Sequence, residues 1–107
     1  MSSSSQSPGL TLTGFQNLIR DRYFATDSLR GTPSTFMWFI EEIGELSTAL
    51  SNNAAGKSPS PDERANLEEE FADVLAWLAT LANINGVDLA AAVAKYTTPG
   101  KVEGVKD

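Results

Sequence analysis

Four acidic residues occur as two pairs whose spacing suits the binding of metal ions. Glu42 and Glu45 form the first pair, and Glu70 and Asp73 form the second, each with a step of three residues. On an α-helix, a step of three places both side chains on one face. Hard divalent cations such as Mg²⁺ prefer oxygen ligands and are commonly held by a few carboxylates together with substrate phosphates. The two pairs therefore predict a divalent-metal site wherever their helices meet.

A tryptophan continues each acidic pair, in mirrored order. Trp38 precedes Glu42 by four residues, and Trp77 follows Asp73 by four residues. Because two antiparallel helices rise equally, by about 1.5 Å per residue, one register makes the tryptophans face each other and the acidic pairs face each other. Four carboxylates without a neighbouring Lys or Arg repel one another unless they bind protons or cations. A solvated acidic surface is the alternative interpretation, but the mirrored spacing favours the metal site.

Two helix start signals fall in the first half of the chain. Thr13 begins a capping-box pattern and predicts a helix over residues 13–23. Thr32 stands before Pro33, which combines an N-cap with the residue type favoured at the first helical position. No further proline follows for many residues, so this signal predicts a helix over residues 32–51.

Two further signals fall in the second half. Ser60 precedes Pro61 and a capping-box glutamate, which predicts a helix over residues 60–85 with Gly86 as its left-handed end. An aspartate then caps a short alanine-rich helix over residues 88–96. No segment alternates with the period of a strand, so the predicted fold class is all-α.

Length and composition limit the remaining possibilities. The 107 residues fit one domain, and we expect a disordered Ser-rich tail over residues 1–12, a helical domain over 13–96 and a mobile tail over 97–107. The net charge of −6 disfavours nucleic acids and anionic membranes as partners. The absence of Cys and His excludes disulfides, thiolate or imidazole metal ligands and Cys or Ser-His-Asp nucleophiles. No apolar run approaches a membrane span and the N-terminus lacks the form of a secretory signal, so we expect a cytoplasmic location.

The apolar residues exceed what one small helical chain can cover. Each of the two long helices carries a stripe with the spacing of a core-facing surface. An antiparallel hairpin with two short flanking helices leaves part of these stripes exposed, so we expect a homodimer or tetramer that completes a four-helix-bundle core. The stripes consist of Phe36, Phe39, Ile40, Ile43, Leu46 and Leu50, and of Leu67, Phe71, Val74, Leu75, Leu78, Leu81 and Ala82.

The acidic motifs also resemble those of a known family. Glu42-Ile43-Gly44-Glu45 and Glu70-Phe71-Ala72-Asp73 resemble the E-x-x-E and E-x-x-D motifs of the MazG-like all-α nucleoside triphosphate pyrophosphohydrolases. The resemblance extends over about residues 15–96 and includes the aromatic residues that flank both motifs. A glycine in mid-helix, as in the first motif, indicates either a close approach of another helix or substrate, or a tolerated cost in helix stability.

The resemblance implies a reaction and a set of ligands. Members of the family cleave a (d)NTP between its α and β phosphates to give a (d)NMP and pyrophosphate, with Mg²⁺ and with Mn²⁺ as the alternative ion. By position, Glu42, Glu45, Glu70 and Asp73 correspond to the metal ligands. The catalytic base that orients the attacking water is then Glu41 or Glu45. The implied role is the clearance of unwanted nucleotides from the cellular pool.

Six residues are candidates for contact with the substrate. The aromatic pair would stack on the base, the two amides would hydrogen-bond it, and the two basic residues would bind the outer phosphates. For each of them, an ordinary position at the surface or at the edge of the core is the alternative. The six candidates are Gln16, Arg30, Trp38, Trp77, Asn83 and Lys95.

Two other functions fit the same residues. Phosphoribosyl-ATP pyrophosphohydrolases and enzymes of the dUTPase or dCTPase type share this scaffold and differ in the substrate pocket, which the acidic motifs do not define. A non-catalytic helical module that forms oligomers, with an acidic face for a basic partner or a structural cation, is the second alternative. Loss of Mg²⁺-dependent pyrophosphate release on substitution of an acidic ligand separates the enzymes from the module.

Overall fold

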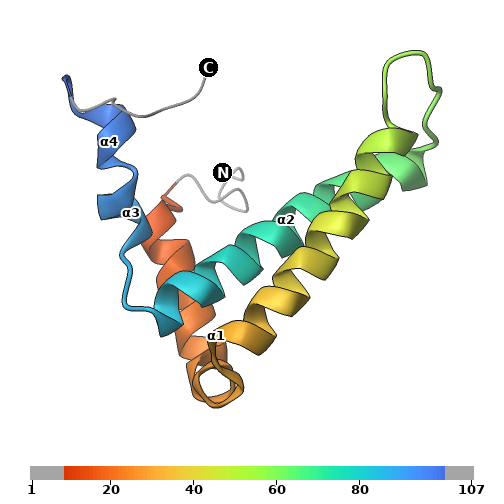
Figure 1. The fold of residues 1–107 in the computed structure, drawn as a ribbon. Helices are drawn as coiled ribbons and strands as arrows, with labels where there is room; N and C mark the ends of the chain where they lie inside the picture. Colours follow the sequence, from red (N-terminus) through yellow and green to blue (C-terminus); the bar gives the residue numbers. More distant parts are fainter. Residues whose placement is uncertain (1–8, 101–107) are drawn as a thin grey trace.

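The computed structural model describes residues 9–100, and within this range every regular element is a helix. Two long helices, α1 (Leu12–Asn52) and α2 (Pro61–Ile84), are followed by two single-turn helices, α3 (Leu89–Ala92) and α4 (Ala94–Thr97). The chain forms a V in which α2 and the second half of α1 run side by side as one arm (Figure 1). The all-α prediction is therefore confirmed for these residues. Of the tails expected at residues 1–12 and 97–107, residues 1–8 and 101–107 lie outside the described part of the chain, whereas Leu12 begins α1 and Thr97 ends α4.

Helix α1 bends sharply at a glycine. Gly31 has φ 80° and ψ 171°, a conformation that no helical residue adopts and that glycine tolerates without strain. Pro33 lies two residues further along the chain, and the second half of α1 starts there in a new direction (Figure 1). The predicted break between two helices is thus confirmed at this point. The hydroxyl of Thr32 accepts a hydrogen bond from the Asn85 amide, 3.1 Å away, and so ties the bend to the end of α2.

The first predicted helix is wrong at both ends. The N-cap is Thr11, two residues before the predicted Thr13; its hydroxyl accepts a hydrogen bond from the Gly14 amide at 2.9 Å, and the helix begins at Leu12. It also continues from residue 23 to the bend at Gly31, because no glycine or proline interrupts it. The capping-box pattern at Thr13 fails because its Gln16 is buried and bonded elsewhere.

The signals in the second half of the chain are confirmed. Ser60 and Glu63 form a reciprocal capping box, with hydrogen bonds of 3.1 and 2.9 Å, and Gly86 has φ 68°. The Asp88 carboxylate accepts a hydrogen bond from the Ala91 amide at 3.3 Å and caps α3. The short last helix, however, divides at Val93 into two single turns.

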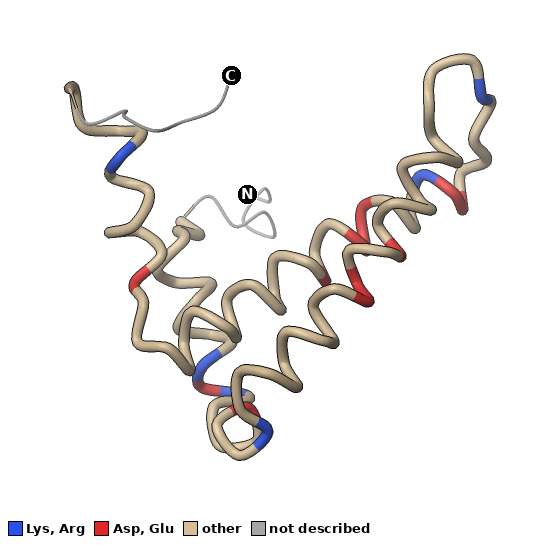
Figure 2. Tube along the Cα trace, in the orientation of Figure 1, with Lys and Arg blue, Asp and Glu red and all other residues tan. Residues whose placement is uncertain are grey.

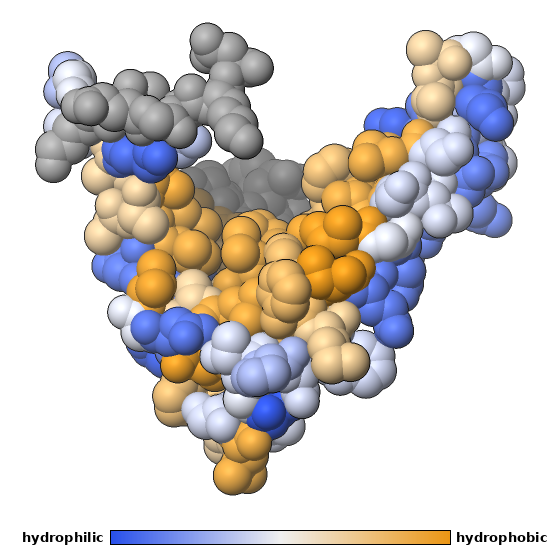
Figure 3. All heavy atoms as spheres, viewed as in Figure 1, coloured by the Kyte–Doolittle hydropathy of each residue, from blue (hydrophilic) through white to orange (hydrophobic). Residues whose placement is uncertain are grey.

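Most of the buried side chains are small or polar, and the predicted stripes contribute only Leu67 and Ala82 to them. Ala49 of α1 and Ala79 of α2 are buried and let the two backbones approach closely. More than half of the stripe residues are exposed on the single chain, where Phe36 is 50% and Phe71 is 53% exposed. Hydrophobic residues accordingly gather in the hollow of the V (Figure 3). Leu67 and Ala82 are buried as predicted, and the expectation that one copy of the chain leaves part of the stripes exposed is confirmed, because its short flanking helices cover too little of them.

A network of amides fastens the N-terminal half of α1 to the turn after α2. The buried Gln16 donates hydrogen bonds through its Nε2 to the Asn83 Oδ1 at 3.0 Å and to the Val87 carbonyl at 2.7 Å. Its Oε1 accepts a hydrogen bond from the Leu89 amide at 2.9 Å. The Asn83 amide returns a hydrogen bond of 3.2 Å to the Gln16 carbonyl. These bonds fix the angle between the two arms of the V.

The helices of residues 9–100 do not individually have the length and composition of membrane spans. Only the pair Pro61–Ile84 and Leu89–Thr97, which is bent by 97°, reaches the required length and composition together.

Candidate metal centre

Two stacked tryptophans set the register of α1 against α2. The ring centroids of Trp38 and Trp77 lie 6.4 Å apart and their planes differ by 16°. Successive helical turns beyond this pair bring the acidic residues of the two helices to the same height. The predicted register is therefore confirmed, and it places the acidic pairs opposite each other.

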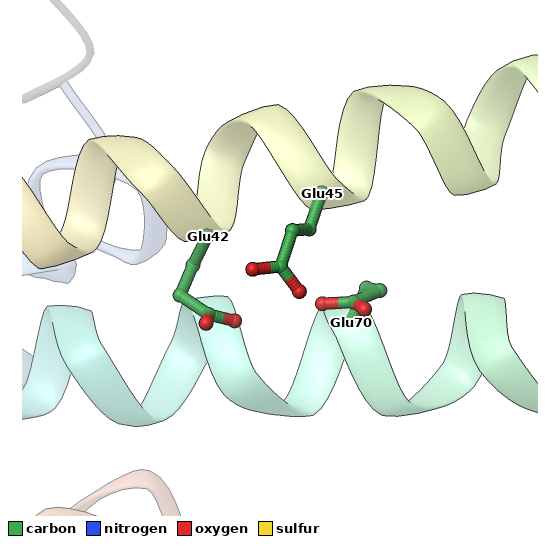
Figure 4. Close-up of side chains that lie close together, drawn as sticks. All are labelled: Glu42, Glu45 and Glu70. Atoms are coloured by element: carbon green, nitrogen blue, oxygen red, sulfur yellow. The ribbon is translucent and has the colours of Figure 1, made fainter.

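Three glutamates from the two helices converge one to two turns beyond the tryptophans. Glu42 and Glu45 project from α1 and Glu70 projects from α2, toward one another in the space between the helices (Figure 4). One carboxylate oxygen from each lies within 4.8 Å of the other two. Glu70 is only 8% exposed and Glu42 is partly buried, while Glu45 is open to solvent. Most of the acidic residues of this arm lie between its middle and the loop that joins α1 to α2 (Figure 2).

The environment opposes the charged form of two of these glutamates. Burial raises the pKa of Glu70 first of all, and the charges of Glu45 and Asp73 raise it further. Burial likewise raises the pKa of Glu42, with further contributions from Glu45 and Asp73. Asp73 therefore acts on the cluster electrostatically, although it is exposed and does not belong to the set of three converging oxygens.

The donor set fits a divalent cation. The buried Oε2 of Glu42 and Oε1 of Glu70 have no hydrogen-bond partner, an unfavourable state for carboxylate oxygens removed from water. The two ion pairs found within residues 9–100, Arg20–Asp21 and Arg30–Asp27, involve none of the cluster. A hard cation satisfies such oxygens and removes the repulsion that raises the pKa values. The residues present therefore suit an all-oxygen metal site.

Glu41 lies beside the cluster but outside it. It is exposed and, with Ser34, Met37 and Trp38, lines a shallow hollow of about 250 Å³ on the outer side of α1. Its charge contributes to the raised pKa of Glu42. Of the two candidates for the catalytic base, Glu45 is thus the one whose carboxylate joins the converging set.

The other predicted substrate contacts lie at three separate places. The amides of Gln16 and Asn83 are bonded to each other at the turn after α2, so their contact with a base stays a prediction. Lys95 lies in α4, with its ammonium 5.5 Å from the centre of the Tyr96 ring, on the other arm of the V from the glutamates (Figure 1). Arg30 lies close to the tryptophan pair, with its guanidinium 5.0 Å from the centre of the Trp77 ring.

Two buried residues that hold Arg30 were missed in the sequence. The Arg30 guanidinium donates to the Asp27 carboxylate, and its Nε donates to the Thr35 hydroxyl at 3.0 Å. Asp27 and Thr35 are both almost fully buried. The step of three residues from Asp27 to Arg30 is typical of a helical ion pair, but the predicted end of the helix at residue 23 leaves both residues outside any predicted helix.

One comparison with known proteins gave a match. The family model described as the MazG nucleotide pyrophosphohydrolase domain matches residues 30–99, about two thirds of the chain. The matched segment contains both acidic pairs and both tryptophans, and it starts after Asp27. A search of curated proteins found no match.

Proposed function

Because the chain belongs to the MazG nucleotide pyrophosphohydrolase family, we propose that it hydrolyses nucleoside triphosphates between the α and β phosphates, with Mg²⁺, to a monophosphate and pyrophosphate. The observation that carries this proposal is the convergence of Glu42, Glu45 and Glu70, two of which hold buried oxygens without a partner. Three such carboxylates suit a divalent cation that is bound together with the phosphates of a substrate. Clearance of unwanted nucleotides is the proposed cellular role.

Each acidic residue has a part in this reaction. Glu42, Glu45, Glu70 and Asp73 would hold the metal ion. When bound, a divalent cation neutralises charge on the phosphates and makes the attacking water more acidic. A carboxylate that is not fully engaged with the metal, Glu45 or the neighbouring Glu41, takes the proton from the attacking water. At the same time the oxygen of this water forms a bond to the α-phosphorus. The bond to the bridging oxygen breaks, and that oxygen leaves with the pyrophosphate.

A homodimer would complete the fold. The large apolar residues in the hollow of the V are exposed on one copy, and a chain of this size gains much from burying them. A second copy that brings the same surface forms a symmetric contact and turns the hairpin into a four-helix bundle. Because each copy brings apolar surface rather than charges to this contact, we expect the dimer to be insensitive to salt.

The reaction can be tested directly. Release of pyrophosphate and of phosphate is measured separately for the eight common NTPs and dNTPs, with Mg²⁺, with Mn²⁺ and with chelator. We expect pyrophosphate, and no phosphate, from at least one nucleotide, only with metal, and its loss in Glu42→Gln. Asp62→Asn is the matched control, because Asp62 is an exposed acidic residue of α2 that does not belong to the converging set. Release of phosphate, or no release in the presence of metal, contradicts the proposal.

A further inference from the structure

A cavity of about 390 Å³ opens between the N-terminal half of α1 and α2. On α2, its wall continues the acidic face: Trp77 and Thr80 follow Asp73 at steps of four and three residues, which keeps all of them on one side of the helix. From Asp73 to Thr80 the rise is about 10 Å. The cavity thus lies beside the proposed phosphate site, at a distance that a nucleoside spans.

The walls of this cavity suit a flat heteroaromatic ring. Ile19, Tyr23, Ala76 and Trp77 supply apolar and aromatic surface on several sides. The polar groups are few, which is typical of a ligand pocket in which a small number of hydrogen bonds fix the orientation. The volume exceeds that of a nucleobase and leaves room for part of the sugar.

The carboxylate of Asp27, one of the polar groups of the cavity wall, has an oxygen without a hydrogen-bond donor. Asp27 is 4% exposed and lines the cavity. Its Oδ1 accepts a hydrogen bond from Arg30, whereas its Oδ2 is buried and has no partner. Leaving a buried carboxylate oxygen unpaired is costly. Because this oxygen has almost no accessible surface, a ligand N–H group at this wall relieves that cost when the carboxylate turns its Oδ2 toward the cavity.

We propose, on the basis of the proposed function, that this cavity binds the base of the substrate and that Asp27 Oδ2 accepts a hydrogen bond from an exocyclic amino group. Arg30, held beside it, is placed to donate to the adjacent ring nitrogen. Cytosine and adenine carry this amino group next to a ring acceptor. Uracil and hypoxanthine carry a carbonyl in its place, which sets an acceptor against an acceptor. The preferred substrates are therefore nucleotides of amino-substituted bases.

Pairs of nucleotides that differ only in this group test the proposal. The ratio kcat/KM is measured for dCTP against dUTP and for dATP against dITP. We expect the amino member of at least one pair to be favoured by about 10-fold to 100-fold, the range typical of a hydrogen bond to a charged group. In Asp27→Asn this ratio falls by about tenfold, because an amide presents either a donor or an acceptor. Asp21→Asn, an exposed position of the same helix, is the matched control and keeps the ratio.

A second variant covers the case in which Asp27→Asn fails to fold. Ala76→Leu places extra carbon atoms on the cavity wall while the Asp27–Arg30 pair stays intact. It is expected to raise KM for dCTP about tenfold or more, with little change in kcat. An unchanged KM in Ala76→Leu overturns the assignment of the cavity.

A binding measurement separates this inference from the proposed function. Titration calorimetry with dCMP and dUMP needs no turnover, and tighter binding of dCMP is expected. If no triphosphate is cleaved but dCMP binds more tightly than dUMP, the proposed function fails and the base pocket stands. If triphosphates are cleaved with equal kcat/KM within each pair, the base pocket fails and the proposed function stands. Equal binding of dCMP and dUMP also overturns the pocket.

Discussion

Trp38 of α1 stacks on Trp77 of α2, with ring centroids 6.4 Å apart. This contact fixes the sliding position of one helix against the other, and a shift by a single residue would break both the stack and the meeting of the glutamates. The stack is itself supported by the Arg30 guanidinium, 5.0 Å from the centre of the Trp77 ring. Aromatic packing therefore enforces the approach of carboxylates that would otherwise repel one another.

Substitution of a proposed metal ligand should separate activity from stability. In Glu42→Gln, pyrophosphate release is expected to fall by about 100-fold or more, since loss of a residue that only hydrogen-bonds to a metal ligand already costs about 10-fold to 100-fold. The melting temperature of the metal-free variant is expected to rise, because a partly buried negative charge and its repulsion are removed. Calorimetry and the pyrophosphate assay check both. A lower melting temperature without metal would contradict the repulsion.

The stability of the metal-free protein should decrease as the pH rises. The pKa values of Glu42 and Glu70 are raised above their ordinary value of 4.5, so the folded state holds protons that the unfolded state has released. Their contribution to stability is present below pH 4.5 and is lost as the pH passes through the raised values. Urea titrations from pH 4.5 to 8 measure this. In Glu70→Gln, the free energy of unfolding should depend less on pH. The same pH dependence in this variant as in the unaltered protein would contradict a raised pKa of Glu70.

Divalent metal should reverse the loss of stability at neutral pH. A cation that binds only the folded protein stabilises it by about 2.7 kcal/mol at a concentration of 100 times its dissociation constant. We expect Mg²⁺ or Mn²⁺ to raise the melting temperature at pH 7.5 in the unaltered chain and much less in Glu70→Gln. Thermal melts with K⁺ at matched ionic strength are the control. A shift of equal size in both proteins would indicate a general salt effect.

Replacement of the mid-helix glycine should be stabilising. A methyl group built on Gly44 meets no atom of the described chain within 4 Å, so alanine gains helix propensity without a clash, worth up to about 1 kcal/mol. Chemical denaturation measures the gain. If Gly44→Ala instead weakens the assembly or the activity, a second copy or the substrate approaches this position.

The buried amide network should be required for stability. Gln16→Ala removes three side-chain hydrogen bonds, which leaves the Leu89 amide without its acceptor and the Asn83 Oδ1 and the Val87 carbonyl without this donor. We expect the free energy of unfolding to fall by about 2–4 kcal/mol. A variant that is stable but has a raised KM would instead support the predicted contact of Gln16 with a base.

The exposed apolar residues should hold two copies together. Ile40→Lys places a charge on the proposed contact and is expected to shift the chain toward monomer in sedimentation velocity runs. Leu29→Lys is the matched control, because Leu29 is 90% exposed and lies near the bend of α1. An unaltered chain that sediments only as monomer at micromolar concentration would rule out the dimer.

Helix ends that are set by local chemistry could be predicted from the sequence. The Ser60–Glu63 capping box, Gly86 and the break before Pro33 involve groups a few residues apart, so their signals are complete within a short segment. The register of the hairpin was also predictable, because equal rise along antiparallel helices converts spacing into height. On this basis, the proximity of the glutamates followed from the chain alone.

Burial and side-chain pairing depend on contacts between distant parts of the chain and could not be predicted from the sequence. Hydrophobic spacing identifies an apolar face without saying which partner covers it, and here the face of Phe36 and Phe71 lies uncovered on one chain. The burial of Asp27 and Gln16 likewise depends on how the N-terminal half of α1 folds back over α2, across the bend at Gly31. Side-chain partners more than 60 residues apart, such as Gln16 and Asn83, are set by that angle, which no local pattern encodes.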